Sequence, residues 1–260
     1  MSLPRLPSDL RAVIADLGGT MVDTLGDFVG VLNTVLTELT LPPVGRAFVE
    51  HTVGKGCEHL NRSTPIEVGA AVGLYASAWA LYQPHYAEVN GPYSSVYPGV
   101  IEGLLHFTER GLRLARLTNK PSAFSVPLLR QNGLDGFFSA VFSGDVCERK
   151  KPDPLPLLKT CEALGSAPGR TLMLGDSSHD ARAARAAGCR IVPVSDGCNH
   201  GAPVLALTKG APCWHGRSDR SPVHPAPHRQ WRRQCARGRW RPSGTGPRAG
   251  SGVENRSRWR

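Results

Sequence analysis

Four polar segments of this chain carry the residue types that phosphoryl transfer needs. They are Asp16-Leu17-Gly18-Gly19-Thr20, Thr118-Asn119, Lys151-Pro152-Asp153-Pro154 and Gly175-Asp176-Ser177-Ser178-His179-Asp180. Transfer through a covalent aspartyl phosphate requires a carboxylate nucleophile, a donor to the phosphoryl oxygens, a cation, and a carboxylate that holds Mg²⁺. The side chains that could fill these roles are, in that order, Asp16, Thr118, Lys151 and Asp176.

The elements around these segments predict how they are positioned. Apolar runs predict strands at residues 13–16, 112–117, 140–142, 170–174 and 189–194. Amphipathic spacing and capping residues predict helices at 100–110, 122–131, 154–164, with Pro154 in the first helical position, and 179–187. Strands that alternate with helices predict an α/β fold with a doubly wound parallel sheet. The carboxyl ends of such strands meet at one edge, where ligands bind.

A long helical region interrupts this alternation after the first strand. From about residue 24 to residue 91, apolar residues recur at helical spacing, and the segment 66–82 favours one amphipathic helix. We therefore expect an all-helical cap at 24–92 and a core domain formed by 1–23 and 93–207. Because 66–82 contains Glu67 and is short for a membrane span, no membrane segment is expected.

The four segments, in this order, resemble the four motifs of the haloacid dehalogenase superfamily, and the helical insert is placed like that family's type-1 cap. Within the superfamily, shorter stretches resemble the phosphoglycolate phosphatases. These are Asp23-Thr24, Val53-Gly54-Lys55-Gly56, Tyr97-Pro98-Gly99-Val100 and Asn199-His200-Gly201. The resemblance covers residues 10–200. It implies a magnesium-dependent phosphatase that hydrolyses 2-phosphoglycolate to glycolate and phosphate.

The resemblance also implies roles for single residues. Asp16 would attack the phosphorus, while Lys151 and Thr118, with the Asn119 backbone, would hold the phosphoryl group. Asp16, Asp176 and the Gly18 carbonyl would bind Mg²⁺, supported by Asp180. In the cap, Lys55, His59 and Arg62 would bind the substrate carboxylate. The alternative, that each is an ordinary surface residue of a polar helix face, is at least as well supported.

Gly18 departs from the family pattern, which places a second aspartate there. That aspartate protonates the leaving alkoxide and later activates water, and glycine can do neither. General acid–base catalysis contributes roughly 10²–10⁴-fold, so we expect reduced turnover. A non-catalytic, degenerate protein is the main alternative. A second, weaker one is a phosphonoacetaldehyde hydrolase-like reaction through a Schiff base on Lys55.

The basic charge lies almost entirely in the last part of the chain. Residues 208–260 carry 13 basic and two acidic residues, a net charge of +11, whereas residues 1–207 carry 18 and 19, a net charge of −1. This stretch has few aliphatic residues and four of the five tryptophans, which predicts a disordered tail. Its composition is also typical of GC-rich sequence translated out of frame. Nucleic-acid binding by the tail is the less favoured reading.

The seven cysteines have irregular spacing and include no C-x-x-C pair. These features and the odd number favour reduced thiols and a cytoplasmic location, because a disulfide framework needs an even number of cysteines. The set Cys198, His200, Cys213 and His215 does not match the spacing of a standard zinc site. The family resemblance implies a small phosphorylated substrate as the partner and Mg²⁺ as the cofactor.

Overall fold

The computed structural model describes residues 6–53 and 57–194. Its centre is a five-stranded sheet in the order β5-β4-β1-β6-β7, and every neighbouring pair is parallel. The strands are β1 (Ala12–Ala15), β4 (Arg113–Leu117), β5 (Ala140–Phe142), β6 (Thr171–Gly175) and β7 (Arg190–Pro193). The predicted doubly wound parallel sheet is therefore confirmed, with β1 as its central strand.

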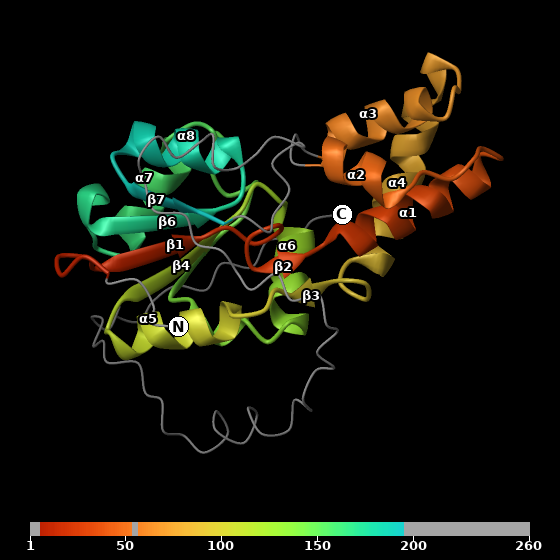
Figure 1. Cartoon of the computed structure of the whole chain (residues 1–260). Coiled ribbons are helices and arrows are strands. Elements are labelled where there is room, and N and C mark those ends of the chain that lie inside the picture. The colour runs from red at the N-terminus through yellow and green to blue at the C-terminus, as the bar shows by residue number, and fades with distance from the viewer. Residues whose placement is uncertain (1–5, 54–56, 195–260) are drawn as a thin grey trace, which may run out of the picture. The chain divides into compact units, whose positions relative to one another are not determined.

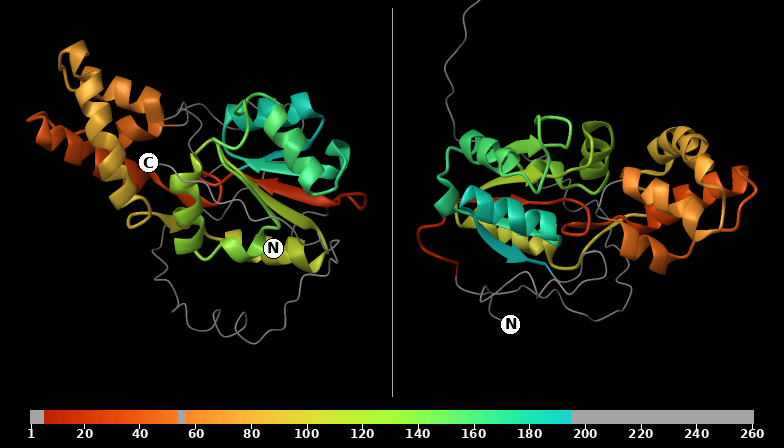
Figure 2. Two further views of the ribbon diagram at one scale, coloured as in Figure 1. Left: turned by 180° about the vertical axis from the view of Figure 1, so that it is seen from behind. Right: turned by 90° about the horizontal axis from the view of Figure 1, so that it is seen from above.

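Helices cover both faces of this sheet (Figures 1 and 2). On one face, α5 (Val100–Glu109) and α6 (Ser122–Gln131) pack against Val13 and Ala15 of β1. On the other, α7 (Leu155–Ala163) and α8 (Ser178–Ala187) pack against Ala12 and Ile14. Successive residues of β1 thus enter opposite cores, as the period of a strand requires. All four β1 residues are buried, which explains why the run is apolar without alternation.

The helices between β1 and the rest of the sheet form a core of their own. They are α1 (Leu25–Glu38), α2 (Arg46–Thr52), α3 (Cys57–Glu67), the 3₁₀ helix η1 (Val72–Leu74) and α4 (Tyr75–Val89). Phe28, Val31 and Leu32 of α1 pack with Tyr82 and Tyr86 of α4. The expected single helix over 66–82 is wrong, because the chain turns at Gly69, whose φ is 69°. No helix among the described residues has the length and apolarity to cross a membrane.

A short antiparallel ribbon lies where the chain enters and leaves these helices. It pairs β2 (Val22–Asp23) with β3 (Ser95–Val96), and Asp27, which is fully buried, accepts hydrogen bonds from the backbone N–H groups of Gly91 and Tyr93, both at 2.9 Å. Strands of two residues leave no periodic signal, so the sequence analysis did not predict this ribbon.

Most remaining elements match their predictions to within two residues, and 122–131 and 140–142 match throughout. The expected position of Pro154 is wrong. It caps α7 instead of occupying the first helical position, and the Asp153 carboxylate accepts a hydrogen bond from Leu155 N–H at 2.9 Å.

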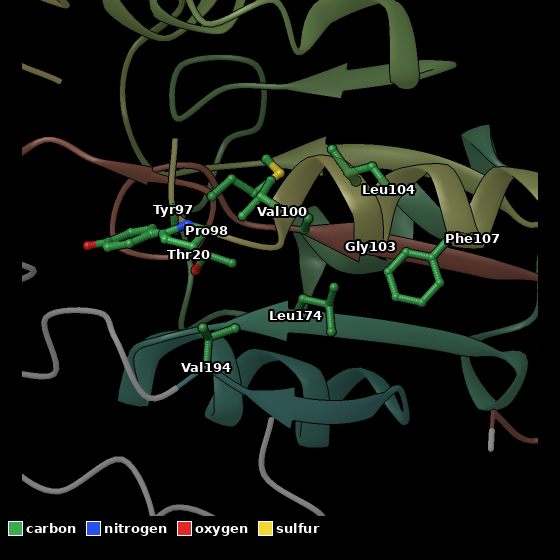
Figure 3. Close-up of a pocket in the computed structure, with 11 residues that line it drawn as sticks. Thr20, Tyr97, Pro98, Val100, Gly103, Leu104, Phe107, Leu174 and Val194 are labelled. Atoms are coloured by element: carbon green, nitrogen blue, oxygen red, sulfur yellow. The ribbon is translucent and has the colours of Figure 1, made fainter. Parts of the chain in front are cut away.

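An apolar pocket lies between α5 and the sheet (Figure 3). Its lining comprises Ala15, Thr20, Met21, Tyr97, Pro98, Val100, Gly103, Leu104, Phe107, Leu174 and Val194. None of these side chains is ionisable except the Tyr97 phenol, so the pocket belongs to the core packing of this face and not to the acidic cluster described below.

Candidate active site

The carboxyl ends of β1, β4 and β6 bring the predicted chemical groups together. Register pairs Ala15 with Arg116 of β4 and with Leu174 of β6, so the chain continues from these strands into Asp16, Thr118 and Asp176 at one edge. All three side chains are buried, with 9%, 5% and 4% of the residue exposed. The sheet edge predicted from the sequence therefore exists, and its three polar side chains are shielded from bulk water.

Lys151 forms ion pairs with two carboxylates of the site, those of Asp16 and Asp180. Its Nζ lies 3.1 Å from Asp16 Oδ1 and 2.6 Å from Asp180 Oδ1, and donates to the Leu117 carbonyl at 3.1 Å. Burial opposes the charged ammonium, but the Asp16 and Asp180 carboxylates outweigh it and raise the Lys151 pKa. Lys151 is therefore held as a cation beside Asp16.

Asp180 is fixed by the start of α8. Its Oδ2 accepts hydrogen bonds from Ser177 N–H at 3.1 Å and from Ser177 Oγ at 2.6 Å, and its N–H donates to Ser177 Oγ at 3.3 Å. This capping box leaves Oδ1 for Lys151. A Cβ at Gly175 would overlap the Asp180 side chain, so glycine at the end of β6 permits this close approach.

The turn after Asp16 also meets Asp176. Gly19 has φ of 80°, and a Cβ there would overlap the Asp176 carboxylate, so only glycine fits. Thr20 Oγ1 donates to Asp176 Oδ1 at 3.0 Å, and Leu17 N–H donates to Asp16 Oδ1 at 2.8 Å. The Gly-Gly-Thr turn thus positions both aspartates.

Gly18 lies in this turn without backbone strain. A Cβ built on it would lie 3.3 Å from Thr24 Oγ1 and 3.9 Å from Thr24 Cγ2, with no backbone atom closer. A larger residue at this position therefore requires only a small adjustment of the Thr24 side chain.

Asn119 has a structural role that the sequence analysis missed. Its Nδ2 donates to the Lys151 carbonyl at 2.8 Å, and its Oδ1 accepts from Lys151 N–H at 3.0 Å. This reciprocal pair ties the loop after β4 to the segment that carries Lys151. The expectation concerned only the Asn119 backbone, and no sequence pattern signals a side-chain contact across 32 residues.

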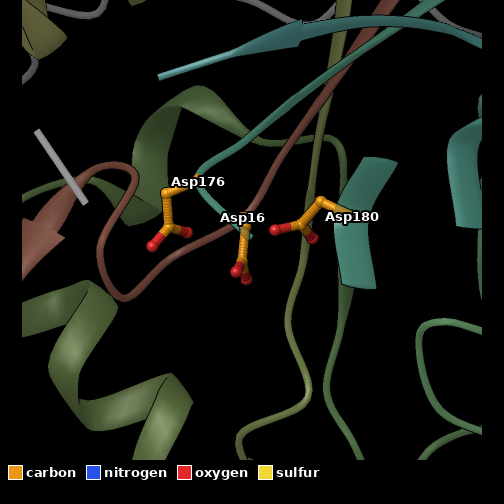
Figure 4. A group of neighbouring side chains, drawn as sticks. All are labelled: Asp16, Asp176 and Asp180. Atoms are coloured by element: carbon orange, nitrogen blue, oxygen red, sulfur yellow. The ribbon is translucent and has the colours of Figure 1, made fainter. Parts of the chain in front are cut away.

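Three carboxylates converge at the site, as Figure 4 shows. Asp16, Asp176 and Asp180 offer ligand oxygens that all lie within 4.8 Å of one another. Lys151 forms ion pairs with two members of this group, Asp16 and Asp180. Burial raises the Asp16 pKa, the Lys151 ammonium opposes the rise, and the Asp180 carboxylate adds to it. A buried donor set of three carboxylates fits Mg²⁺, which prefers oxygen ligands.

Two of the three predicted substrate-binding residues of the helical segment, His59 and Arg62, are among the described residues. Lys55 is outside the described residues. Arg62 is exposed on α3, where its guanidinium lies 4.0 Å from the centre of the Tyr75 ring and pairs with Glu58 at 3.2 Å. His59 is half-buried on the same helix. The substrate-binding roles of Lys55, His59 and Arg62 stay predictions. So does the disordered tail at 208–260, which also lies outside the described residues.

The fold and the site together define a hydrolase built on a parallel α/β sheet with a buried carboxylate–lysine centre. A model of the haloacid dehalogenase-like hydrolase family matches residues 13–194, and the chain belongs to this family. It is 39% identical over 204 residues to a phosphoglycolate phosphatase of Thiobacillus denitrificans, covering 77% of this chain and 90% of the relative. A phosphoglycolate phosphatase of Nitrosococcus oceani is 38% identical over 195 residues, covering 74% and 87%.

Solved structures agree with this assignment. A predicted phosphoglycolate phosphatase from Haemophilus somnus superposes with a TM-score of 0.72 at 28% identity, covering 77% of this chain and 92% of that one. A haloacid dehalogenase superfamily hydrolase from Geobacter sulfurreducens gives a TM-score of 0.61 at 25% identity, covering 72% and 87%. The recognised superfamily, the fold and the enzyme class of phosphoric monoester hydrolase are thereby confirmed.

Proposed function

We propose that Asp16 is the nucleophile of a phosphatase that passes through an aspartyl phosphate. The convergence of Asp16, Lys151, Asp176 and Asp180 carries this proposal. An Asp16 oxygen attacks the phosphorus, the bond to the ester oxygen breaks, and that oxygen leaves with the electron pair. The Lys151 ammonium, 3.1 Å from Asp16 Oδ1, favours the ionised nucleophile and attracts the phosphoryl oxygens.

The remaining groups of the site bind and orient. Thr118 Oγ1 and the backbone N–H of Asn119 are the proposed donors to the phosphoryl oxygens, because the Asn119 side chain is already engaged with Lys151. Asp16, Asp176 and the Gly18 carbonyl would hold Mg²⁺, with Asp180 acting through Lys151. When bound, Mg²⁺ would neutralise charge on the phosphoryl group.

Gly18 limits the proposed reaction at two points. The leaving alkoxide needs a proton, and the water that later attacks the aspartyl phosphate must lose one. Gly18 has no side chain to carry either proton, so both steps depend on solvent. We propose a phosphatase of low turnover, slowed by roughly 10²–10⁴-fold relative to a chain with a proton-transferring group there.

The proposed substrate is 2-phosphoglycolate, hydrolysed to glycolate and phosphate. The support is the agreement of two curated relatives, both phosphoglycolate phosphatases, that the chain covers by 90% and 87% of their length. The helical segment 24–92 is proposed to be a cap on a core of 1–23 and 93–207, with Lys55, His59 and Arg62 contributing to the substrate site. A cytoplasmic location stays a prediction.

The second candidate is a protein that keeps Mg²⁺ and phosphate binding without catalysis. The absence of any side chain at Gly18 is the observation that favours it. The two candidates differ in whether Asp16 becomes phosphorylated.

Acid-quench mass spectrometry with p-nitrophenyl phosphate separates these candidates, because p-nitrophenolate leaves without needing an acid. With Mg²⁺, we expect Asp16 to gain the mass of one phosphoryl group and to lose it slowly, since water activation is impaired. Asp16→Asn is the control and should acquire none. An unmodified Asp16 peptide in the unsubstituted protein, with no nitrophenol released, would contradict the phosphatase proposal and support the non-catalytic candidate.

A further inference from the structure

Lys120 belongs to the loop that carries the phosphoryl-binding groups. It is the second residue after Thr118, and its backbone N–H donates to Thr118 Oγ1 at 3.3 Å. Its carbonyl accepts a hydrogen bond from Gly144 N–H at 2.9 Å. The backbone of Lys120 is therefore fixed at the same sheet edge as Asp16, although the sequence analysis assigned it no role.

The Lys120 side chain extends from this edge to the helical segment. Its Nζ donates to the Tyr86 hydroxyl of α4 and lies 3.4 Å from Asn90 Oδ1, at the end of the same helix. The Phe28 ring of α1 has its centre 5.3 Å from Nζ. Phe28 stacks on Tyr86 with 5.4 Å between ring centres and 7° between planes, so the ammonium is placed by a rigid aromatic pair.

The Lys120 ammonium lacks a counter-ion within the described part of the chain. Both of its hydrogen-bond acceptors, a phenol and an amide, are neutral, and no carboxylate there forms an ion pair with it. Burial lowers its pKa to about 8, with the Asp27 and Asp16 carboxylates acting against the shift. A desolvated cation with only neutral partners is stabilised by an anionic ligand.

Three other described cations, Arg62, Lys151 and Arg116, are alternatives to Lys120, and each has partners of its own. Arg62 pairs with Glu58 at 3.2 Å and covers the Tyr75 ring on an exposed face. Lys151 already contacts three oxygen atoms, one each of Asp16, Asp180 and the Leu117 carbonyl. Arg116, which Asp16 also influences, is fully buried, and its guanidinium donates to the Phe142 carbonyl at 3.0 Å and to Ser143 Oγ at 3.2 Å, so it is closed to a ligand. Lys120 is half-buried and forms no ion pair with the described residues, although Asp16 acts on its charge.

We propose that Lys120 binds a carboxylate of the substrate while Asp16 faces its phosphoryl group. Lys120 would thereby select small phosphomonoesters that carry a carboxylate close to the ester oxygen. This inference rests on the proposed phosphatase function and deepens it. It places the carboxylate subsite where the loop after β4 contacts α4. Tyr86 and Asn90 are the positioning residues, since they orient the ammonium through their oxygen atoms.

Two non-hydrolysable ligands that differ only in the carboxylate test this proposal. 3-Phosphonopropionate has the shape of 2-phosphoglycolate with a methylene in place of the ester oxygen, and propylphosphonate lacks the carboxylate. We would titrate both into the unsubstituted full chain with Mg²⁺ by calorimetry, and repeat the titrations with Lys120→Met. The unsubstituted chain should prefer 3-phosphonopropionate, and Lys120→Met should reduce that preference by about tenfold or more.

Matched variants separate this specific effect from damage to the fold. Lys159→Met removes the same charge from α7, outside the site, and should keep the preference. Tyr86→Phe keeps the ring stack and removes only the hydroxyl that orients Nζ, so it should reduce the preference partly. It also tests the proposal if Lys120→Met fails to fold.

Each outcome has a distinct meaning. Binding of neither phosphonate to the unsubstituted chain would overturn the proposed function and the inference with it. Equal binding of both would overturn the carboxylate subsite and leave the phosphatase proposal standing. A preference that survives in both Lys120→Met and Tyr86→Phe would show that another group binds the carboxylate.

Discussion

Lys151 Nζ and Asp180 Oδ1 form a buried ion pair at 2.6 Å, and Asp16 shares the same ammonium at 3.1 Å. Asp180 is fully buried, so removing its charge leaves part of the Lys151 charge without compensation. We expect Asp180→Asn to lower the free energy of unfolding by about 3–5 kcal/mol, measured by urea denaturation. Asp153→Asn, which removes the exposed pair with Arg149, should change it little. Equal effects would contradict the assignment of Asp180 as the support of Lys151.

The reciprocal hydrogen bonds between Asn119 and the Lys151 backbone predict a kinetic effect. Asn119→Ala breaks both bonds and frees the loop that carries Lys151. We expect kcat for p-nitrophenyl phosphate to fall by about tenfold or more, because a misplaced charge loses most of its effect on the transition state. Asn132→Ala, at the end of α6, provides a control of the same chemistry. An unchanged kcat in Asn119→Ala would show that Lys151 is positioned without these two hydrogen bonds.

The convergence of three buried carboxylates at the site predicts stabilisation by Mg²⁺. A ligand at about 100 times its Kd stabilises the native state by about 2.7 kcal/mol, and relief of repulsion between Asp16 and Asp176 acts in the same direction. We expect the melting temperature to rise when Mg²⁺ replaces EDTA, as measured by calorimetry. The rise should vanish in Asp176→Asn; its persistence there would place the metal elsewhere.

Lys120 predicts a specific pH dependence of stability. Its pKa is lowered from 10.5 in the unfolded chain to about 8 in the folded protein. Between these values the unfolded state binds more protons, so the stability that Lys120 contributes rises with pH. We compare the free energy of unfolding of the unsubstituted protein with that of Lys120→Met. The difference, unsubstituted minus variant, should increase by more than about 1 kcal/mol as the pH rises from 7.5 to 9.5. Parallel urea titrations at the two pH values measure this difference, and a constant gap would contradict the burial of the ammonium.

The strands were predictable because both faces of the sheet are covered. Ala12 to Ala15 and Thr171 to Gly175 are buried throughout, so their sequences are continuous apolar runs that end directly at Asp16 and Asp176. The candidate site followed from the same fact, since parallel strands deliver their carboxyl ends to one edge.

Contacts between distant segments were not predictable from the sequence. The Asn119–Lys151 clamp and the Lys120–Tyr86 contact join residues 32 and 34 positions apart, and neither follows from a local pattern. The error at 66–82 has a local cause. Apolar residues continue at helical spacing through Gly69, whose positive φ ends the first helix.

The central claim is that Asp16 is a competent nucleophile in a site that lacks a proton-transferring group at Gly18. The measurement is the steady-state rate of phosphate release from 2-phosphoglycolate by Gly18→Asp, with Gly18→Asn as the control of equal size. A Cβ at this position would lie 3.3 Å from Thr24 Oγ1, so both side chains need the same small adjustment. We predict that Gly18→Asp raises the rate by about tenfold or more and that Gly18→Asn does not. A folded Gly18→Asp protein with no gain over the unsubstituted chain would contradict the claim.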